Sequence, residues 1–347
     1  MHRYVIDDGT SIRSEIVVGR DLETDIVDGV VEGGHGAVAV ICQPATYARA
    51  ERIAGLLAGV GLRATGYALP DGEDAKQMSV VEDVYRHLNR QGFTRSDLVL
   101  GVGGGALTDV VGFVGGTYLR GIAVSYVPTT LLGAVDASIG GKTGVNVDGK
   151  NLAGVFKHPD RVVIDIDILD ALPERLRIDG AAEALKTGFI SDMAIVEAYE
   201  RDGIAVDLED VVNRSVAVKV SIVGDDFRER GRRAFLNYGH TVGHAIETST
   251  GRSHGESVAI GMIAAGGASA AHFGFTGEGR QRDVVRAIGL PTEAEGAHRE
   301  VIRSLMALDK KRDRSGLRFV LLRAFGEPEV VAADDATVEA ALRAVGL

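Results

Sequence analysis

Residues 97–109 read DLVLGVGGGALTD, an apolar strand-like run that passes through three consecutive glycines into a helical pattern. Glycines at such a junction let backbone amides approach a phosphate closely, and the partial positive charge of a helix N-terminus favours an anion there. The string is not the GxGxxG fingerprint of dinucleotide-binding folds. The glycines and the helix start still favour a dinucleotide site, and the alternative is a plain tight turn between strand and helix.

The same alternation of strand and helix extends through the first half of the chain. Strand-like runs cover 37–42, 62–68, 97–101, 123–127 and 162–166, and helical patterns cover 46–59, 79–91 and 106–119. Alternation with short connections predicts a parallel sheet covered on both faces. Residues 1–172 are therefore expected to form a Rossmann-like α/β domain.

Long helical patterns take over beyond Pro173. They cover 178–191, 193–202, 208–223, 236–248, 256–272 and 279–288, and a strand-like run at 317–322 precedes a closing helix from residue 335. Residues 173–347 are thus expected to form a mainly α-helical C-terminal domain. The most apolar stretch, 258–275, is dominated by Ala and Gly and predicts a buried helix rather than a membrane span. Because ligands of open parallel sheets lie beyond the strand ends, a site at the domain junction is expected.

Composition excludes several classes of partner. The formal net charge of −11 over 347 residues argues against general affinity for nucleic acids or anionic membranes. Any anion site must then be a local basic pocket. The single cysteine, Cys42, cannot form an internal disulfide, and the first residues lack the apolar core of a signal peptide. A cytoplasmic location is the default expectation.

Lysine is rare, with 8 among the 38 basic residues. A sequence that uses arginine for ordinary surface charge keeps lysine where a compact, titratable ammonium is needed. Lys142 and Lys150 lie in the glycine-rich segment 136–151, DASIGGKTGVNVDGKN. Ammonium groups on such backbone suit the binding of phosphate and hydroxyl oxygens, and a solvated surface loop is the alternative.

Three of the nine histidines lie within fifteen residues of one another, in the segment 237–254, NYGHTVGHAIETSTGRSH. His240 and His244 are four apart on a predicted helix and share one face, and His254 follows a loop. Histidine is the commonest metal ligand, so this cluster predicts a metal site that takes a further ligand from elsewhere.

The apolar segment 178–186, IDGAAEALK, places Glu183 and Lys186 one helical turn apart. Spacing alone favours a simple ion pair between them. The alternative is a buried carboxylate that binds a metal beside a lysine that binds a substrate anion.

Taken together, these strings resemble the 3-dehydroquinate synthase family of sugar-phosphate cyclases over roughly residues 70–322. The segments that carry the resemblance are PDGEDAK (70–76), GGGALTDVVGF (103–113), VPTTLLGAVDASIGGKTGVN (127–146), GAAEALKTG (180–188), RRAFLNYGHTVGHAIE (232–247) and HGESVAIGM (254–262). The resemblance implies a homodimeric enzyme that uses NAD and zinc or cobalt.

The resemblance also implies roles for individual residues. The metal ligands would be Glu183, His240 and His254. The NAD site would include Asp71, Gly72, Glu73, Lys76, Gly104, Gly105, Asp109, Thr129 and Thr130, with Lys142 and Lys150 lining both cofactor and substrate. The phosphate and carboxylate of the substrate would be held by Arg120, Lys186, Lys219, Arg233, Asn237, His244 and Lys310, and its hydroxyls would contact Asp136 and Asn151.

The implied reaction converts 3-deoxy-D-arabino-heptulosonate 7-phosphate, a small phosphorylated sugar acid, to 3-dehydroquinate and phosphate. NAD-mediated oxidation is followed by phosphate elimination, return of the hydride and an intramolecular aldol closure, with the substrate's own phosphate as the implied base. The same residues would suit a cyclase for the amino analogue of this substrate, or another sugar-phosphate cyclase of secondary metabolism. A metal-dependent alcohol dehydrogenase would instead produce NADH. A binding protein without activity would have lost metal ligands, and Glu183, His240 and His254 are all present.

Three features depart from the family pattern. The spacer between His244 and His254 is two or three residues shorter than expected. The first strand of the α/β half ends at Gln43, where an acidic residue for the adenosine ribose is usual. The spacer between Lys142 and Lys150 is about one residue shorter than is common.

Overall fold

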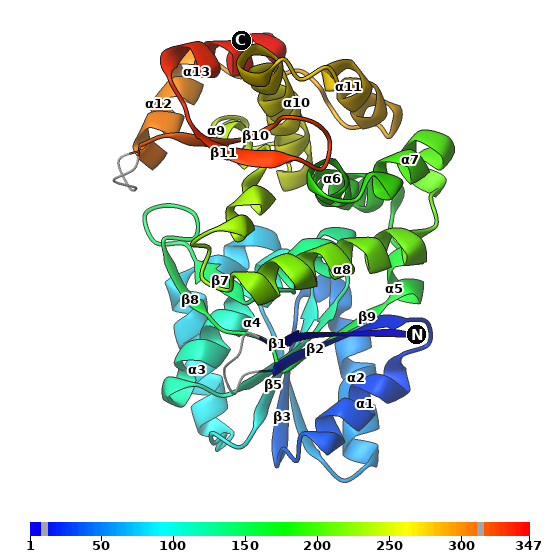
Figure 1. Ribbon diagram of the computed structural model, residues 1–347. Helices are drawn as coiled ribbons and strands as arrows, with labels where there is room; N and C mark the ends of the chain where they lie inside the picture. The colour runs from blue at the N-terminus through cyan, green and yellow to red at the C-terminus, as the bar shows by residue number, and fades with distance from the viewer. Residues whose placement is uncertain (8–12, 311–315) are drawn as a thin grey trace. The chain divides into compact units, whose positions relative to one another are not determined.

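The computed structural model describes residues 1–7, 13–310 and 316–347, which divide into two compact units (Figure 1). The first unit contains Met1–Leu172 together with Lys219–Phe227, and the second contains Pro173–Val218 and Arg228–Leu347. The short segment Lys219–Phe227 therefore belongs to the first unit, although it lies within the C-terminal half of the sequence.

A seven-stranded sheet in the order β1-β2-β9-β6-β5-β3-β4 forms the centre of the first unit. Its strands are β1 (His2–Asp7), β2 (Arg13–Gly19), β3 (Ala37–Cys42), β4 (Arg63–Ala68), β5 (Leu98–Gly103), β6 (Ala123–Pro128) and β9 (Arg161–Asp165). Neighbouring strands are parallel except for the antiparallel pair β1–β2. Every residue of β3 and β5 is buried, as expected of strands covered on both faces.

Helices cover both faces of this sheet. They are α1 (Glu23–Glu32), α2 (Tyr47–Gly59), α3 (Met78–Arg90), α4 (Gly105–Thr117) and α5 (Ile166–Asp170), with the short turns η1 (Pro44–Thr46), η2 (Gly72–Lys76), η3 (Tyr118–Arg120) and η4 (Gly133–Ala137). Helices α1 and α2 pack together on one side, and α3 and α4 pack together on the other (Figure 1). The chain runs from β3 outward to β4 and from β5 outward to β6, so the strand order reverses between β3 and β5. Open sheets bind ligands at such a switch point, beyond the carboxyl ends of the strands.

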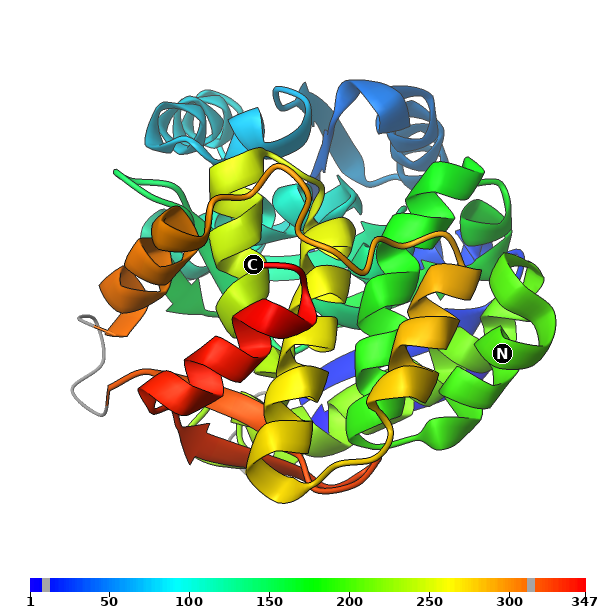
Figure 2. The same ribbon diagram turned by 90° about the horizontal axis from the view of Figure 1, so that it is seen from above.

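Helices dominate the second unit. They are α6 (Glu174–Ile190), α7 (Met193–Asp202), α8 (Leu208–Asp225), α9 (His240–Thr250), α10 (His254–Phe273), α11 (Glu278–Ala287), α12 (Arg299–Lys310) and α13 (Asp335–Ala344), with the turns η5 (Gly203–Ala205) and η6 (Arg232–Asn237). An antiparallel pair, β10 (Arg318–Leu322) and β11 (Pro328–Ala332), packs beside them. Helix α10 lies in the middle of this unit and packs against α6, α9, α11 and α13 (Figure 2). It contains the buried helix that the sequence predicts.

The predicted fold class, a parallel α/β sheet domain followed by a mainly helical one, is confirmed. Several elements were not predicted: the N-terminal hairpin β1–β2 with α1, the helix α12 and the strand β11. Part of the glycine-rich segment 136–151 is also more regular than a loop, because Lys142–Val145 forms β7 and pairs with β8 (Ala153–Phe156). Within the described residues, no helix combines the length and apolarity needed to cross a membrane.

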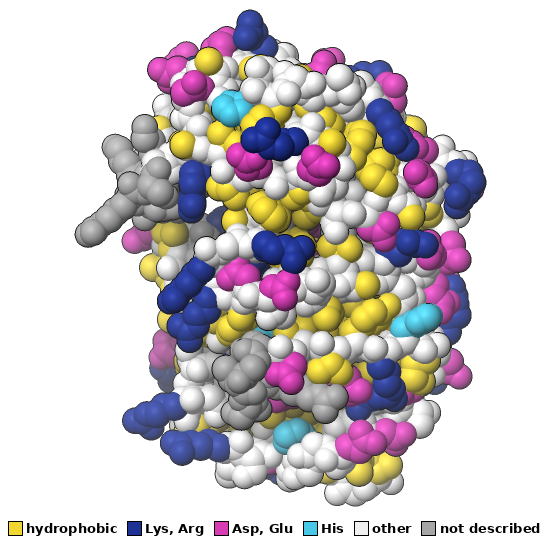
Figure 3. Space-filling model, in the orientation of Figure 1, with side chains coloured by type: hydrophobic (Ala, Val, Ile, Leu, Met, Phe, Trp, Pro, Cys, Tyr) yellow, Lys and Arg dark blue, Asp and Glu magenta, His cyan; other side chains and the backbone are white. Residues whose placement is uncertain are grey.

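Acidic and basic side chains are interspersed on the face shown in Figure 3. Mixed charge of this kind produces no broad field of one sign on that face.

Candidate active site

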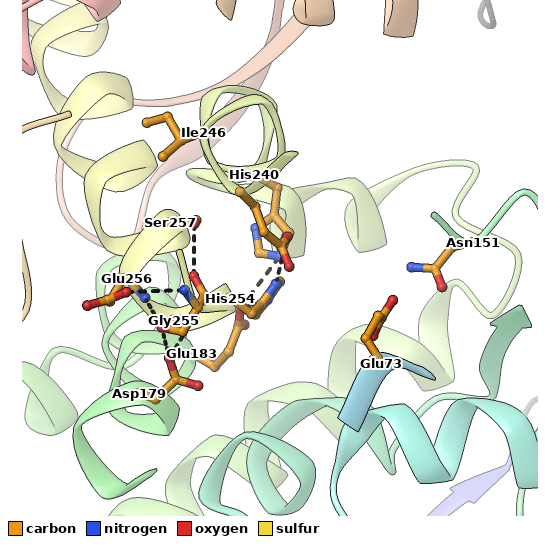
Figure 4. A network of polar contacts seen from close by, with 12 residues as sticks. Glu73, Asn151, Asp179, Glu183, His240, Ile246, His254, Gly255, Glu256 and Ser257 are labelled. Atoms are coloured by element: carbon orange, nitrogen blue, oxygen red, sulfur yellow. Dashed lines mark hydrogen bonds and ion pairs between the residues drawn. The ribbon is translucent and has the colours of Figure 1, made fainter. Parts of the chain in front are cut away.

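Three side chains from three helices of the second unit converge on one point. Glu183 lies in α6, His240 is the first residue of α9, and His254 is the first residue of α10. One ligand atom from each lies within 4.8 Å of the others. The Nε2 atoms of His240 and His254 are 3.5 and 3.1 Å from Oε1 of Glu183 (Figure 4). The predicted convergence of a carboxylate and two imidazoles is confirmed.

A glycine brings the start of α9 against α10. Gly239 precedes His240 with φ of 81°, in the left-handed region that favours glycine. A Cβ at this position would lie 2.7 Å from Cγ of Met262 and 2.9 Å from its backbone nitrogen. Only glycine allows this close approach, which directs His240 toward the other two side chains.

The cluster fits a divalent metal ion. Nδ1 of His240 lies 3.2 Å from the carbonyl oxygen of Tyr238, and Nδ1 of His254 lies 3.5 Å from a carboxylate oxygen of Glu247. With Nδ1 directed to these acceptors, both Nε2 atoms face Glu183, as in catalytic zinc sites. Zinc bonds of about 2.0–2.1 Å in tetrahedral geometry separate ligand atoms by about 3.4 Å. The observed separations of 3.1 and 3.5 Å agree with that spacing.

Charges around the cluster are closely balanced. The second carboxylate oxygen of Glu183 forms an ion pair with the ammonium of Lys186, and both side chains are buried. Burial would raise the pKa of Glu183, but Lys186 and the imidazoles hold that pKa well below its usual range. The ion pair between Glu183 and Lys186 that spacing favours exists, and the same buried carboxylate also faces the two histidines.

The two imidazoles differ in their affinity for protons. Burial and the nearby Lys186 hold the pKa of His240 well below its usual value. Burial also acts to lower the pKa of His254, but hydrogen bonds to Glu183 and Glu247 outweigh it and raise that pKa to about 10. In the metal-free protein at neutral pH, His254 is protonated and His240 is neutral.

The other implied residues of the second unit lie on the same segments or beside them. His244 is exposed, and its ring centroid lies 5.1 Å from that of His240 and 6.3 Å from that of His254. Arg233 is buried in η6, and Asn237 ends that turn. The side chain of Lys310 lies outside the described residues.

One contact of Asn237 was missed by the sequence reasoning. Its Nδ2 donates a hydrogen bond of 2.6 Å to a carboxylate oxygen of Glu229. Glu229 adopts a positive φ of 55°. It is the single acidic residue in the basic run RERGRR (228–233), and that isolation is the signal that could have drawn attention to it.

In the first unit, the glycine turn after β5 lies beside the turn after β6. A Cβ at Gly104 would lie 3.0 Å from Cγ2 of Thr130, and the backbone nitrogen of Thr129 donates to the carbonyl oxygen of Gly103. Gly105 is the first residue of α4. The structure therefore brings four implied cofactor residues to the ends of two adjacent strands, where a helix N-terminus begins.

Lys76 joins three segments that the resemblance singles out separately. Its buried ammonium donates to Oδ2 of Asp109 at 2.6 Å and to Oδ1 of Asn151 at 2.5 Å. Glu73, one turn earlier, accepts a hydrogen bond of 3.0 Å from Asn146. Burial raises the pKa of Asp109 to about 6, although Lys76 counteracts the rise.

The remaining implied residues of the first unit fall into an ion pair, between the buried Lys219 and the partly exposed Asp136, and an exposed group. The ammonium of Lys219 forms an ion pair with Asp136 and donates 2.9 Å to the Asp136 carbonyl oxygen. The exposed residues are Asp71 and Gly72 at the start of η2, Arg120 at the end of η3, Lys142 at the start of β7 and Lys150 in the β7–β8 connection.

Gln43 replaces the usual acidic residue at the end of β3. Its amide Nε2 donates to the carbonyl oxygens of Pro70 and Gly72, at 2.9 and 3.1 Å. The side chain therefore fixes the backbone that leads into η2.

Comparisons with known proteins identify the family of the chain. Residues 66–179 match the 3-dehydroquinate synthase N-terminal family, and residues 180–312 match the 3-dehydroquinate synthase C-terminal family. A 3-dehydroquinate synthase of Corynebacterium diphtheriae is 43% identical over 319 residues, which cover 89% of either chain. That of Thermobifida fusca is 39% identical over 349 residues, covering 97% of this chain and 95% of its own.

A solved structure shares the whole architecture. The 2-epi-5-epi-valiolone synthase of Streptomyces hygroscopicus, with NAD⁺ and Zn²⁺ bound, is 27% identical and has a TM-score of 0.88 over 97% of either chain. The two family models together match residues 66–312, which lie in both units. This chain belongs to the 3-dehydroquinate synthase family of sugar-phosphate cyclases.

Proposed function

We propose that the chain converts 3-deoxy-D-arabino-heptulosonate 7-phosphate to 3-dehydroquinate and phosphate, a step of the shikimate pathway to aromatic amino acids. The observation that carries this proposal is the cluster of the buried Glu183 with the partly buried His240 and His254, with Lys186 beside it. A cluster of this kind serves a reaction in which negative charge develops on substrate oxygens.

NAD and a zinc or cobalt ion supply, when bound, a hydride acceptor and a Lewis acid. Glu183, His240 and His254 would hold the metal. A cyclase 27% identical to this chain was solved with NAD⁺ and Zn²⁺, which supports both cofactors here. Residues around Lys76, Gly104, Asp109 and Thr130 would hold NAD, and Gln43 would orient the loop at Gly72 without the usual carboxylate.

The chain's cations would bind and orient the substrate. The proposed contacts to phosphate and carboxylate are Arg120, Lys142, Lys150, Lys186, Lys219, Arg233, Asn237, His244 and Lys310, and those to hydroxyls are Asp136 and Asn151. Lys186 and Lys219 are both buried, and each ammonium forms an ion pair with a carboxylate that compensates its charge. Fixed cations hold the substrate in the geometry that elimination and ring closure require.

The proposal also includes the roles of the two domains, the cellular location and the oligomeric state. Residues 1–172 would bind NAD, and residues 173–347 would bind the metal and much of the substrate. The protein would act in the cytoplasm as a homodimer, as the family resemblance implies. Sedimentation velocity on the purified protein tests the dimer.

The decisive experiment measures phosphate release from the heptulosonate phosphate by the purified protein. Turnover is expected to need both NAD and metal, to stop with a chelator, to resume when zinc or cobalt is added back, and to produce no net NADH. Accumulation of NADH would identify an alcohol dehydrogenase instead. The amino analogue of the substrate, assayed in parallel, separates the two cyclase activities, and preference for it would overturn the proposed substrate.

A further inference from the structure

Asp179 contacts the chain on both sides of a metal-binding histidine. It lies in α6, four residues before Glu183, so the two carboxylates are one turn apart on the same helix. Its Oδ1 accepts hydrogen bonds from Oγ of Ser253, at 2.5 Å, and from the backbone nitrogen of Gly255, at 3.0 Å (Figure 4). His254 lies between these two donors.

The backbones of α6 and α10 also approach closely at this point. A Cβ at Gly255 would lie 2.0 Å from the carbonyl oxygen of Asp179 and 2.7 Å from its Oδ1. Real Cβ atoms do not tolerate such distances, so the contact requires glycine. The first turn of α10 is therefore attached to α6 through both backbone and side chain.

Asp179 adds to a cap that is already complete. Oγ of Ser253 accepts from the backbone nitrogen of Glu256, and the Glu256 carboxylate accepts in return from the backbone nitrogen of Ser253. This is the reciprocal capping box of helix N-termini. Asp179 accepts one hydrogen bond from the hydroxyl group of Ser253 and another from a backbone amide of the first turn, which has no partner within the helix. Its carboxylate is also favoured near the positive end of the helix.

The attachment of α10 to α6 matters for His254 because this histidine is the first residue of α10. Helix α9 ends at Thr250 and α10 begins at His254, so only Gly251, Arg252 and Ser253 connect them. This connection is the one that is shorter than the family pattern. A residue that opens a helix is prone to fraying unless other contacts hold it.

We propose that Asp179 is a positioning residue for the metal centre: it fixes the backbone of His254 to the helix that carries Glu183. The first and third metal ligands are then held at a set separation by α6 itself. The inference rests on the metal centre of the proposed function. Asp179 does not touch the metal, the substrate or NAD in this scheme, and it acts through His254.

The test compares zinc affinity among variants of the full-length protein, measured by competition with a chromophoric chelator. Asp179→Ala is expected to weaken zinc binding by about 10–100-fold, the range for residues that support metal ligands. Asp179→Asn keeps an oxygen that can accept both hydrogen bonds, so it should recover most of the affinity. The visible absorption of the Co²⁺-loaded protein should change in intensity for Asp179→Ala and stay near wild type for Asp179→Asn.

A matched control separates positioning from general helix stability. Asp334 caps α13 in a similar way and accepts from the backbone nitrogen and hydroxyl of Thr337, at 2.8 and 2.7 Å. Asp334→Ala removes an equivalent carboxylate from another helix of the same unit. It should leave zinc affinity and the Co²⁺ spectrum unchanged.

The outcomes are distinct. If Asp179→Ala binds zinc like the wild type with an unaltered Co²⁺ spectrum, or if Asp334→Ala weakens zinc binding equally, the inference is wrong. Should Asp179→Ala not fold, Ser253→Ala removes one of the two hydrogen bonds and must still weaken zinc binding for the inference to stand. A wild-type protein that binds no zinc at all would instead refute the metal centre of the proposed function.

Discussion

Nε2 of His254 lies 3.1 Å from Oε1 of Glu183, and the other carboxylate oxygen of Glu183 pairs with Lys186. One buried carboxylate thus faces both an ammonium and a protonated imidazole in the metal-free protein, and Glu247 supplies a second negative charge beside that imidazole. A divalent ion that replaces the imidazole proton would keep the carboxylate in the same position. The charge balance of the cluster therefore makes its stability, its protonation and its metal affinity interdependent.

Removing the carboxylate should strongly destabilise the metal-free protein. Glu183→Ala leaves the ammonium of Lys186 buried without that partner, which typically costs about 3–5 kcal/mol of unfolding free energy. The double variant Glu183→Ala/Lys186→Met removes the charge as well and should recover a large part of that loss. Urea unfolding in the presence of chelator measures both. A single variant as stable as the wild type would contradict the buried ion pair.

Metal binding should release protons. Since the pKa of His254 is raised to about 10 in the metal-free protein, its imidazole must lose a proton before it can bind a metal at neutral pH. Zinc affinity should therefore fall about tenfold for each pH unit lowered between pH 8 and 7. Calorimetry in buffers of different ionisation enthalpy counts the protons released. Zinc binding at pH 7.5 without proton release would show that His254 is neutral.

The raised pKa of His254 should also make the unfolding free energy of the metal-free protein depend on pH. A histidine whose pKa is raised above its usual 6.5 stabilises the folded state fully below pH 6.5. This contribution is lost as the pH rises toward 10. Urea unfolding in chelator should show a lower unfolding free energy at pH 9.5 than at pH 6.5, and His254→Ala should reduce that difference.

Loss of the third ligand should abolish metal binding and turnover. His254→Ala should weaken zinc binding by more than about 100-fold, beyond the usual effect of changing a supporting residue. Phosphate release should fall with it. The control is His272→Ala, because His272 is an exposed histidine near the end of the same helix. Elemental analysis and the phosphate assay check both, and a His254→Ala protein that retains zinc and activity would remove the metal assignment.

Lys142 should matter for turnover and little for folding. Its side chain is exposed at the start of β7, so Lys142→Ala should change the unfolding free energy by no more than about 0.5 kcal/mol. Loss of a charged contact to the substrate should lower turnover by about 100-fold or more. Lys157 follows the neighbouring strand β8 and lies outside the segments that resemble the family, which makes Lys157→Ala the control. Normal turnover by Lys142→Ala would contradict the substrate contact.

Much of the fold could be predicted because its central strands are unambiguous. The run at 37–42 is wholly apolar, and residues 98–103 are apolar residues and glycines, as expected of the central strands of a covered parallel sheet. The hairpin β1–β2 was missed because it lies at the edge of the sheet, and β1 is largely exposed. The sequence could not predict that Lys219–Phe227 belongs to the first unit, because α8 is a single helix with one continuous hydrophobic pattern.

The residues of the candidate site also differ in whether the sequence could predict them. Glu183, His240 and His254 carry their chemistry in their residue types, so spacing and resemblance could single them out. Asp179 and Glu229 act through hydrogen bonds to Ser253, Gly255 and Asn237, which depend on how helices and turns meet. The sequence around each residue does not show how these helices and turns pack together, so the contacts of both residues were not predicted.

The distribution of lysines has a consequence for covalent labelling. Among the six lysines whose side chains are described, Lys76, Lys186 and Lys219 are buried, whereas Lys142, Lys150 and Lys157 are at least partly accessible. The other positively charged side chains are largely arginines, which acylating reagents leave intact. An activated ester or a pyridoxal-type aldehyde should therefore modify few positions on this protein, and two of the accessible amines are ones that the substrate would shield.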